Sequence, residues 1–161
     1  MISVPFTVDN QTVRTEFLGN QLFTGLDGLR SEEVPRWGRM TPQQMVEHLL
    51  WAMEVSNGVA TVECKVPPRL TERLRTFLHN DTPTSHDFMN PVLKQGLPAL
   101  RYQGIPEAVA ALRTQMDHFL QQRDEQDLRV HPVFAPLSHE QWSRAHFKHF
   151  HHHLLQFGLI G

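Results

Sequence analysis

The side chains best suited to chemistry gather near the end of the chain, where residues 146–158 read HFKHFHHHLLQFG. Five of the eleven histidines of the chain occupy eight positions there. Imidazole nitrogens bind divalent metal ions and titrate near neutral pH, so this stretch is compatible with a metal site, a proton sensor or the polar face of a helix. An expression tag is excluded, because Phe147 and Phe150 interrupt the histidines and LLQFGLIG follows them.

Placed on a helix at 100° per residue, the side chains of this stretch separate into distinct faces. The core stripe consists of Phe147, Phe150, Leu154 and Phe157. One flank of that stripe carries His146, His149 and His153. Lys148 and His152 fall on the side expected to face solvent, and His151 falls on the opposite boundary of the core. The histidines are therefore not equivalent. Only the three on this flank are expected to lie next to the core, where a buried site could form.

A metal site would use the pair His149 and His153, which are four residues apart, so that their Cβ atoms lie about 5–6 Å from each other on one helix face. Two nitrogens do not complete a site, but a third imidazole from a facing helix leaves positions open for water or substrate, as in catalytic zinc sites. His48, expected beside the buried face of an earlier helix, is the candidate third ligand. The alternative is that each histidine bonds to a carbonyl or a carboxylate, because an HxxxH pair also arises by chance.

Two capping boxes mark the starts of the helices that carry these histidines. The helix with His48 is expected over residues 42–57, because Thr41 and Gln44 form a T-x-x-Q box. Proline at its first position suits a helix start, since its missing N–H is not needed there. The second of these helices is expected over residues 138–157, where the pattern S-x-x-Q recurs.

Two further helices are expected over residues 9–30 and 106–126, where apolar residues recur near helical spacing. Residues 58–104 are rich in proline and contain at most one short helix, at about 68–78, so they form a long crossover. Short connections join the first two and the last two of the four helices. This order predicts an all-α fold, a four-helix bundle with a long crossover between its second and third helices, in a single domain covering residues 1–161. An irregular all-α domain is the alternative.

The composition narrows the classes of partner. The formal net charge is −2 and the pI is about 6.6, so no excess of basic residues favours nucleic acid or an anionic membrane. Cys64 is the only cysteine and cannot form an internal disulfide, and the N-terminal residues lack the pattern of a secretory signal. No apolar run approaches the roughly 20 residues that cross a bilayer. We therefore expect a cytoplasmic protein that binds neither nucleic acid nor membrane.

Three stretches resemble the DinB/YfiT-like family of metalloenzymes, and in particular its branch of short bacterial proteins of unknown function. Residues 37–49, WGRMTPQQMVEHL, resemble the pattern W-G-x-M-S/T-x-x-Q-M-x-x-H of that branch. Residues 131–142, HPVFAPLSHEQW, resemble H-P-x-F-G-P-L-S/T-x-x-x-W, with Ala135 where glycine is usual. Residues 146–158 resemble H-x-K-H-x-x-H-H-L-x-Q-F-G. The resemblance covers both histidine helices, whereas the crossover matches only loosely.

This resemblance implies an antiparallel four-helix bundle in which one histidine of the second helix and two of the fourth hold a divalent metal ion. Matched to this sequence, the ligands are His48, His149 and His153. Gln156 follows His153 by three residues, as the common glutamine of the family follows its last ligand, which favours His153 over His152. Imidazole ligation suits zinc, nickel, copper or iron, and we expect zinc or nickel.

The activity that the resemblance implies is that of a metal-dependent enzyme acting on a small molecule, because some relatives are thiol-dependent transferases and others are metal-dependent hydrolases. Much of the wider family has Arg-Gly where this chain has Leu154 and Leu155, so no particular substrate can be carried over. A non-catalytic metal- or ligand-binding bundle and a pH sensor are the alternatives. A homodimer is implied by the resemblance alone.

No catalytic residue can be assigned, because no acidic residue is placed to serve as a general base. Glu47 adjoins His48 and points about 100° away from it. The side chains expected to contact the ligands or a substrate are Gln44, Gln156 and His146. Trp37 and Trp142 are expected to pack in the core, and Cys64 has neither a base nor metal-ligand spacing.

Overall fold

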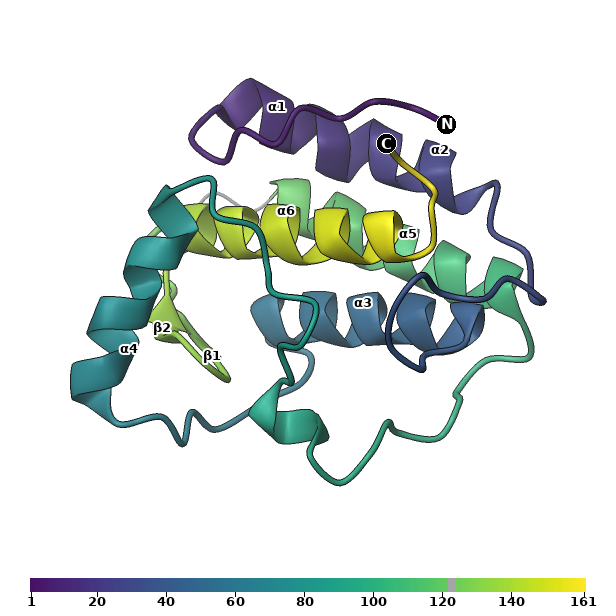
Figure 1. Cartoon of the computed structure of the whole chain (residues 1–161). Helices are drawn as coiled ribbons and strands as arrows, with labels where there is room; N and C mark the ends of the chain where they lie inside the picture. Colours follow the sequence, from purple (N-terminus) through teal and green to yellow (C-terminus); the bar gives the residue numbers. More distant parts are fainter. Residues whose placement is uncertain (122–123) are drawn as a thin grey trace.

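The computed structural model describes residues 1–121 and 124–161 and is mostly helical, with one short antiparallel sheet (Figure 1). The structure therefore agrees with the all-α class expected from the sequence. In chain order the helices and strands are α1 (Gln11–Glu16), α2 (Leu22–Leu26), α3 (Pro42–Ser56), α4 (Pro68–Leu74), α5 (Ile105–Gln121), β1 (Arg129–His131), β2 (Ala135–Leu137) and α6 (His139–Gln156). The shorter elements are a π-helical segment, η1 (Phe17–Gln21), and two 3-10 helices, η2 (Arg75–His79) and η3 (Pro91–Leu93).

The first expected helix, over residues 9–30, is found as a continuous helical path from α1 through η1 to α2. It ends at Leu26, earlier than expected, because the chain then tightens and the N–H of Gly28 bonds to the carbonyl of Gly25. The π-helical segment includes Gly19, whose carbonyl accepts a hydrogen bond from a guanidinium of α5 at 2.9 Å. The segment is therefore tied to the helix that packs beside it.

Both capping boxes are formed as the sequence predicts. At the start of α3 the hydroxyl of Thr41 accepts from the backbone N–H of Gln44 at 3.2 Å, and the side chain of Gln44 accepts from the N–H of Thr41 at 2.9 Å. At the start of α6 the same exchange joins Ser138 and Gln141, with distances of 3.2 and 3.1 Å. These boxes fix where the two histidine helices begin, and hence which residues face the core.

The crossover contains the single short helix expected near residues 68–78, formed by α4 and η2, and in addition the 3-10 helix η3, which was not expected. Figure 1 shows it leaving α3, reaching α4 beside the hairpin and returning below α3 to α5. The returning segment is fastened to α3 by two acids. The backbone N–H of Arg101 donates to Glu47 at 2.6 Å, and its guanidinium forms an ion pair with Glu54 at 2.6 Å.

A β-hairpin precedes α6, where the sequence analysis expected only a short connection. Strands β1 and β2 pair antiparallel, with His131 opposite Ala135. The imidazole Nδ1 of His131 accepts the backbone N–H groups of Val133 and Phe134, at 3.0 and 3.2 Å, and so closes the turn. The hairpin was missed because three-residue strands contain too little alternation to be recognised.

The third expected helix is found as α5, described over Ile105–Gln121, and it does not extend to the expected residue 126. Positions 122 and 123 of that expectation lie outside the described residues, and residues 124–126 are not helical. Among the residues that the structure describes, no helix is long and apolar enough to cross a membrane.

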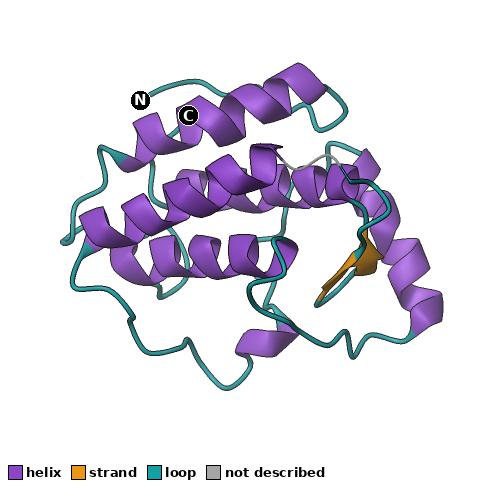
Figure 2. Cartoon of the chain, turned by 180° about the vertical axis from the view of Figure 1, so that it is seen from behind, coloured by secondary structure: helices purple, strands orange, loops and turns teal. Residues whose placement is uncertain are grey.

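Helix α6 runs through the middle of the protein and contacts α1, α2, α3, the hairpin and η2 (Figure 2). Lys148 was expected to face solvent, and this was wrong, because its exposed fraction is 1%. Its ammonium group donates to the carbonyls of Phe77 and Asn80 and lies 3.4 Å from the centre of the Phe77 ring. The crossover element η2 covers this face of α6, and the local pattern of α6 does not contain that information.

One hydrophobic core cluster draws on side chains from Val4 to Ile160. The two ends of the chain meet beside it, where Ile2 and Ile160 form a parallel bridge and the N–H of Gly161 donates to the carbonyl of Ile2 at 3.0 Å. The last residues after α6 are therefore anchored by the first ones.

Candidate metal centre

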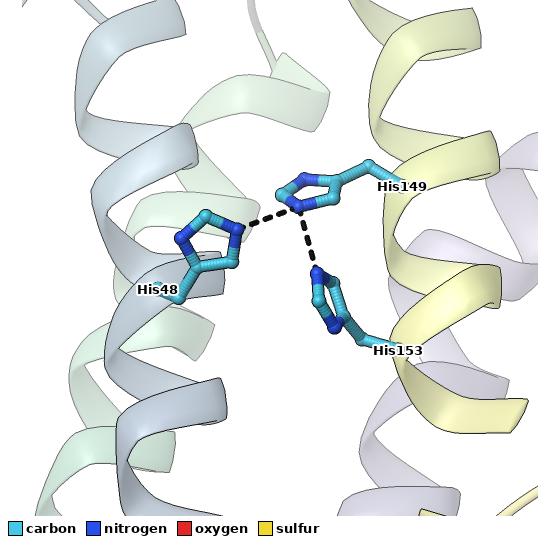
Figure 3. Close-up of side chains that lie close together, drawn as sticks. All are labelled: His48, His149 and His153. Carbon is cyan, nitrogen blue, oxygen red and sulfur yellow. Dashed lines mark hydrogen bonds between the residues drawn. The ribbon is translucent and has the colours of Figure 1, made fainter. Parts of the chain in front are cut away.

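Three imidazole nitrogens converge between α3 and α6 (Figure 3). The Nε2 atoms of His48 and His149 are 2.9 Å apart, and those of His149 and His153 are 3.1 Å apart. Each histidine offers a ligand atom that lies within 4.8 Å of the other two. The structure thus brings together the three residues that the sequence analysis selected, across 101 positions of the chain.

The helices place these rings by simple geometry. His149 and His153 are one turn apart on α6 and project from the same face. His48 lies in the middle of α3, which packs against α6. The capping boxes set where both helices begin. The direction in which each ring points therefore depends in part on residues far from the site.

The spacing of the three nitrogens can be set beside the spacing that a bound ion imposes on its ligands. With metal–nitrogen distances of about 2.0–2.1 Å and tetrahedral geometry, ligand nitrogens stand about 3.3 Å apart. Two of the three separations, 2.9 and 3.1 Å, are within a few tenths of an ångström of that value, and all three nitrogens lie within 4.8 Å of one another. The three residues therefore fit a divalent ion held by imidazole nitrogens.

The electrostatic surroundings keep the three rings neutral. Burial, and secondarily the neighbouring His152, lowers the pKa of His48 to about 4. Burial, followed by the proximity of the other imidazoles, holds the pKa values of His149 and His153 well below the ordinary 6.5. Neutral imidazoles have a free lone pair, so at neutral pH no proton has to be displaced from an imidazolium before an ion can bind.

Burial differs among the ligands. The exposed fractions of His48 and His153 are 8% and 7%, whereas His149 is partly exposed. The ring of Trp51, one turn after His48 on α3, stacks against it with centroids 5.9 Å apart. His149 is therefore the most exposed of the three candidate ligands.

Of the three side chains expected to contact the ligands, the structure places one there. The Oε1 atom of Gln156 lies 2.8 Å from Nδ1 of His153. Gln44 instead completes the capping box of α3. His146 bonds to the hydroxyl of Ser56 at 2.8 Å and is almost fully buried, with an exposed fraction of 1%.

The acidic residues near the cluster in sequence do not join it. The metal-binding group found among the described residues contains three histidines and no carboxylate. Glu47, next to His48, accepts from backbone N–H groups of Arg101 and Tyr102, and from the side chain of Gln43. Its carboxylate therefore holds the crossover, in agreement with the expectation that it points away from His48.

Trp37 was expected to pack in the core, and this was wrong, because it lies outside the hydrophobic core cluster. Its ring is partly buried and stacks on His86 with centroids 3.7 Å apart and a 5° angle between planes. His152 lies 5.3 Å away, and its ring is in turn 5.0 Å from that of His153. The indole Nε1 is buried and has no hydrogen-bond partner among the described residues. The main-chain carbonyl of Trp37 accepts a hydrogen bond from the side chain of Gln156, a contact that no pattern of side chains predicts.

Trp142 has the packing role that the sequence predicts. Its ring is 3% exposed, and its Nε1 donates to the carbonyl of Arg129 in the hairpin at 3.1 Å. It therefore joins α6 to the hairpin and does not reach the three histidines.

A hollow of about 870 Å³ lies elsewhere, between α2 and the starts of α3 and α5, where Phe23, Pro42 and Ile105 are among its lining residues. The three histidines do not line it. The candidate chemistry is therefore at the histidine cluster and not in this hollow.

Fold and site together define a mostly helical protein with a buried cluster of three histidines in metal-binding geometry. Neither a family model, nor a curated protein, nor a solved structure matches the chain. The function of the cluster is therefore argued from its own geometry.

Proposed function

We propose that this chain binds one divalent metal ion through His48, His149 and His153 and acts as a metal-dependent transferase or hydrolase. The observation that carries the proposal is the convergence of three Nε2 atoms from two helices, with separations of 2.9 and 3.1 Å. Zinc and nickel are the proposed ions, because both accept imidazole ligands. The resemblance to the DinB/YfiT-like family supports the same three residues.

The four-helix bundle belongs to the same proposal. In Figures 1 and 2 the helical path of α1 and α2 lies alongside α3, α5 and α6. The connection from α3 to α5 is long and contains α4. This arrangement supports a DinB/YfiT-like bundle in which the crossover follows the second helix, with a hairpin before the last helix.

The chemistry follows from what the chain provides around an ion. When bound, a divalent ion lowers the pKa of a water or thiol that it coordinates and so supplies a nucleophile near neutral pH. Buried His48 and His153 form one side of the centre, where the ring of Trp51 stacks against that of His48. The partly exposed His149 marks the side from which a small-molecule substrate reaches it. A thiol transferase is one form of this activity.

A non-catalytic metal- or ligand-binding protein is the second candidate. It is favoured by the chemistry of the described cluster, which contains no carboxylate to act as a general base. The two acids of α3 nearest the cluster, Glu47 and Glu54, are both occupied by Arg101 of the crossover.

The remaining parts of the proposal concern partners and location. The net charge of −2 supports a protein without nucleic-acid or membrane partners, and the single Cys64 supports a cytoplasmic location. A homodimer is proposed on the resemblance alone, and light scattering of the untagged protein tests it.

Metal analysis of the untagged full chain tests the proposed site. After growth with added zinc or nickel, we expect about one ion per chain, as for a single three-histidine centre. His149→Ala should release the ion, because two nitrogens remain. His118→Ala, which removes an exposed histidine of α5, is the matched control and should retain it. A wild-type protein that stays free of metal after supplementation contradicts the proposal.

Turnover separates the two candidates. The metal-loaded protein is screened with thiols and with hydrolysable esters and amides, and His149→Ala serves as the blank. Activity that depends on the ion supports the enzyme, whereas stoichiometric metal without turnover of any of these substrates supports the binding protein.

A further inference from the structure

The segment that leads into α3 forms hydrogen bonds with Gln156, the last residue of α6. The backbone N–H of Arg36 donates to the carbonyl of Gln156 at 2.7 Å. The side-chain Nε2 of Gln156 donates to the carbonyl of Trp37 at 2.8 Å. Both ends of this glutamine are therefore held by residues 36–37, and its side chain is 4% exposed.

These contacts decide which way the amide of Gln156 points. A carbonyl oxygen only accepts hydrogen bonds, so the group facing Trp37 has to be the amide NH₂ and not the amide oxygen. The oxygen Oε1 then faces the ring of His153, 2.8 Å from Nδ1. The orientation of the amide is fixed by a main-chain carbonyl that cannot change its role.

The tautomer of His153 follows from the same reasoning. Since Oε1 of Gln156 is an acceptor, Nδ1 of His153 has to carry the proton and donate. In a neutral ring the other nitrogen, Nε2, then has a free lone pair. That nitrogen is the one that lies 3.1 Å from His149 at the centre of the cluster.

Gly38 allows the amide of Gln156 to come close enough to bond to the carbonyl of Trp37. Its φ of +79° lies in the left-handed region that favours glycine, and a Cβ added there would lie 2.8 Å from Nε2 of Gln156. A side chain at this position would therefore both strain the backbone and push the amide away.

His149 offers a contrast. Its Nε2 is directed at His48 and His153, and its Nδ1 has no partner in the hydrogen bonds of the described residues. No neighbour therefore holds the proton of His149 at Nδ1, whereas the proton of His153 is held there before any ion arrives.

We propose that the carbonyl of Trp37 and the close approach of Gly38 are positioning groups that act through Gln156 to hold His153 as a ligand with Nε2 free. The proposal rests on the metal-binding function, since a preset lone pair matters only if an ion binds. Groups of this kind, which orient a ligand without touching the ion, commonly change metal affinity by 10–100-fold when removed.

The tautomer can be read in the metal-free protein by long-range proton–nitrogen correlation in NMR. We expect His153 of the untagged wild-type chain in the Nδ1–H form. Gln156→Leu should let it adopt the Nε2–H form that imidazole favours in water. The matched control is Gln115→Leu, which removes an acceptor for Asn57, the residue after the end of α3, and should leave His153 unchanged. An Nε2–H ring in the wild type, or an unchanged ring in Gln156→Leu, overturns the proposal.

Zinc affinity is measured by competition with a chromophoric chelator. Gln156→Leu is expected to raise the Kd for zinc by about 10–100-fold, and Gln115→Leu to leave it within about 2-fold. Equal zinc affinity in Gln156→Leu and the wild type rejects the positioning role while the metal site stands.

Gly38→Ala provides a second, independent variant, and thermal unfolding of each protein checks that it is folded. If Gly38 acts through Gln156, the substitution raises the Kd in the wild-type background and adds nothing in the Gln156→Leu background. The same increase in both backgrounds means that Gly38 has only a structural role, which refutes the proposal. A wild type that binds no zinc defeats the proposed function instead, and the tautomer of His153 still decides the positioning proposal.

Discussion

Three neutral imidazoles whose Nε2 atoms face one another do not satisfy their own hydrogen bonding. Once Nε2 of His153 is an acceptor, His149 can donate its single Nε2–H to His153 or to His48, but not fully to both. At least one buried lone pair then lacks a good partner, which costs about 1–3 kcal/mol. An ion at the centre removes that deficit, so the cluster is better matched to a metal than to a purely structural role.

Lys148 has a charged side chain that is almost completely buried. Burial lowers the pKa of its ammonium group to about 8, while Asp81 opposes that effect. The group therefore remains protonated at neutral pH. The carbonyls of Phe77 and Asn80 compensate it, and both belong to the end of the short helical stretch of the crossover. The ammonium group thus anchors this part of the crossover to α6.

Lys148→Met should destabilise the protein. Methionine fills a similar volume but leaves the two carbonyls without their donor, so we expect a loss of about 1–3 kcal/mol. Urea unfolding followed by circular dichroism measures it. The matched control is Lys94→Met, at an exposed position of the crossover, which should change stability by less than about 0.5 kcal/mol. An equal effect of both substitutions contradicts the anchoring role of Lys148.

The ligands of the site could be predicted, whereas some of their supports could not. His149 and His153 follow from a spacing of four on one helix, and His48 from its place beside an apolar face. The burial of Lys148 depends on a segment about 70 residues away that covers it. The carbonyl of Trp37 is a main-chain group, present in every residue, so no residue type reveals its role.

At the scale of elements, the hairpin before α6 contains a strained residue. Ala135 has a φ of +61°, in the left-handed region. This is the position at which the resembling family usually has glycine. For a residue with a Cβ, the left-handed conformation costs roughly 1–2 kcal/mol. Pairing with His131 in the strand register holds Ala135 there.

Ala135→Gly is expected to stabilise the protein. Relief of the strain is partly offset by the greater freedom of glycine in the unfolded chain, so the net gain is about 0.5–1 kcal/mol. The comparison in urea uses Ala99→Gly, at an exposed loop position without a positive φ, where a small loss is expected. If Ala135→Gly loses as much stability as Ala99→Gly, the backbone at residue 135 is not strained.

Helix starts were predicted better than connections for a physical reason. The capping boxes at Thr41 and Ser138 are local, so four residues contain the whole signal. The end of the first helical path at Leu26 and the hairpin near His131 depend on tight turns and on a side chain that accepts backbone N–H groups. Such contacts have no period in the sequence.

At the scale of the whole molecule, the crossover packs against both helices that carry the candidate ligands. It covers one side of α6 through η2, and it is fastened to α3 where it returns through Glu47 and Glu54. His86 of the same segment stacks on Trp37, which contacts Gln156. The long link between the second and third expected helices therefore contributes to the surroundings of the candidate ligands.

Several imidazoles are buried and neutral in the folded protein, which makes its stability depend on pH. Burial lowers the pKa values of His131 and His146 to about 3, and that of His48 to about 4. In the unfolded chain these groups titrate near 6.5. Between the two sets of values the unfolded state binds more protons, so the stability is fully present above about pH 6.5 and is lost as the pH falls toward 3.

The metal-free protein should therefore lose stability above the range in which carboxylates titrate. Each of the three buried histidines contributes a loss on the order of 2 kcal/mol between about pH 6.5 and 5, since one pKa unit corresponds to about 1.4 kcal/mol. Urea unfolding at about pH 7.5, 6.5 and 5 measures the change. His118→Ala, which removes an exposed histidine, should leave the pH dependence unaltered. A free energy of unfolding that is the same at about pH 7.5 and 5 would show that these imidazoles are not held neutral by the fold.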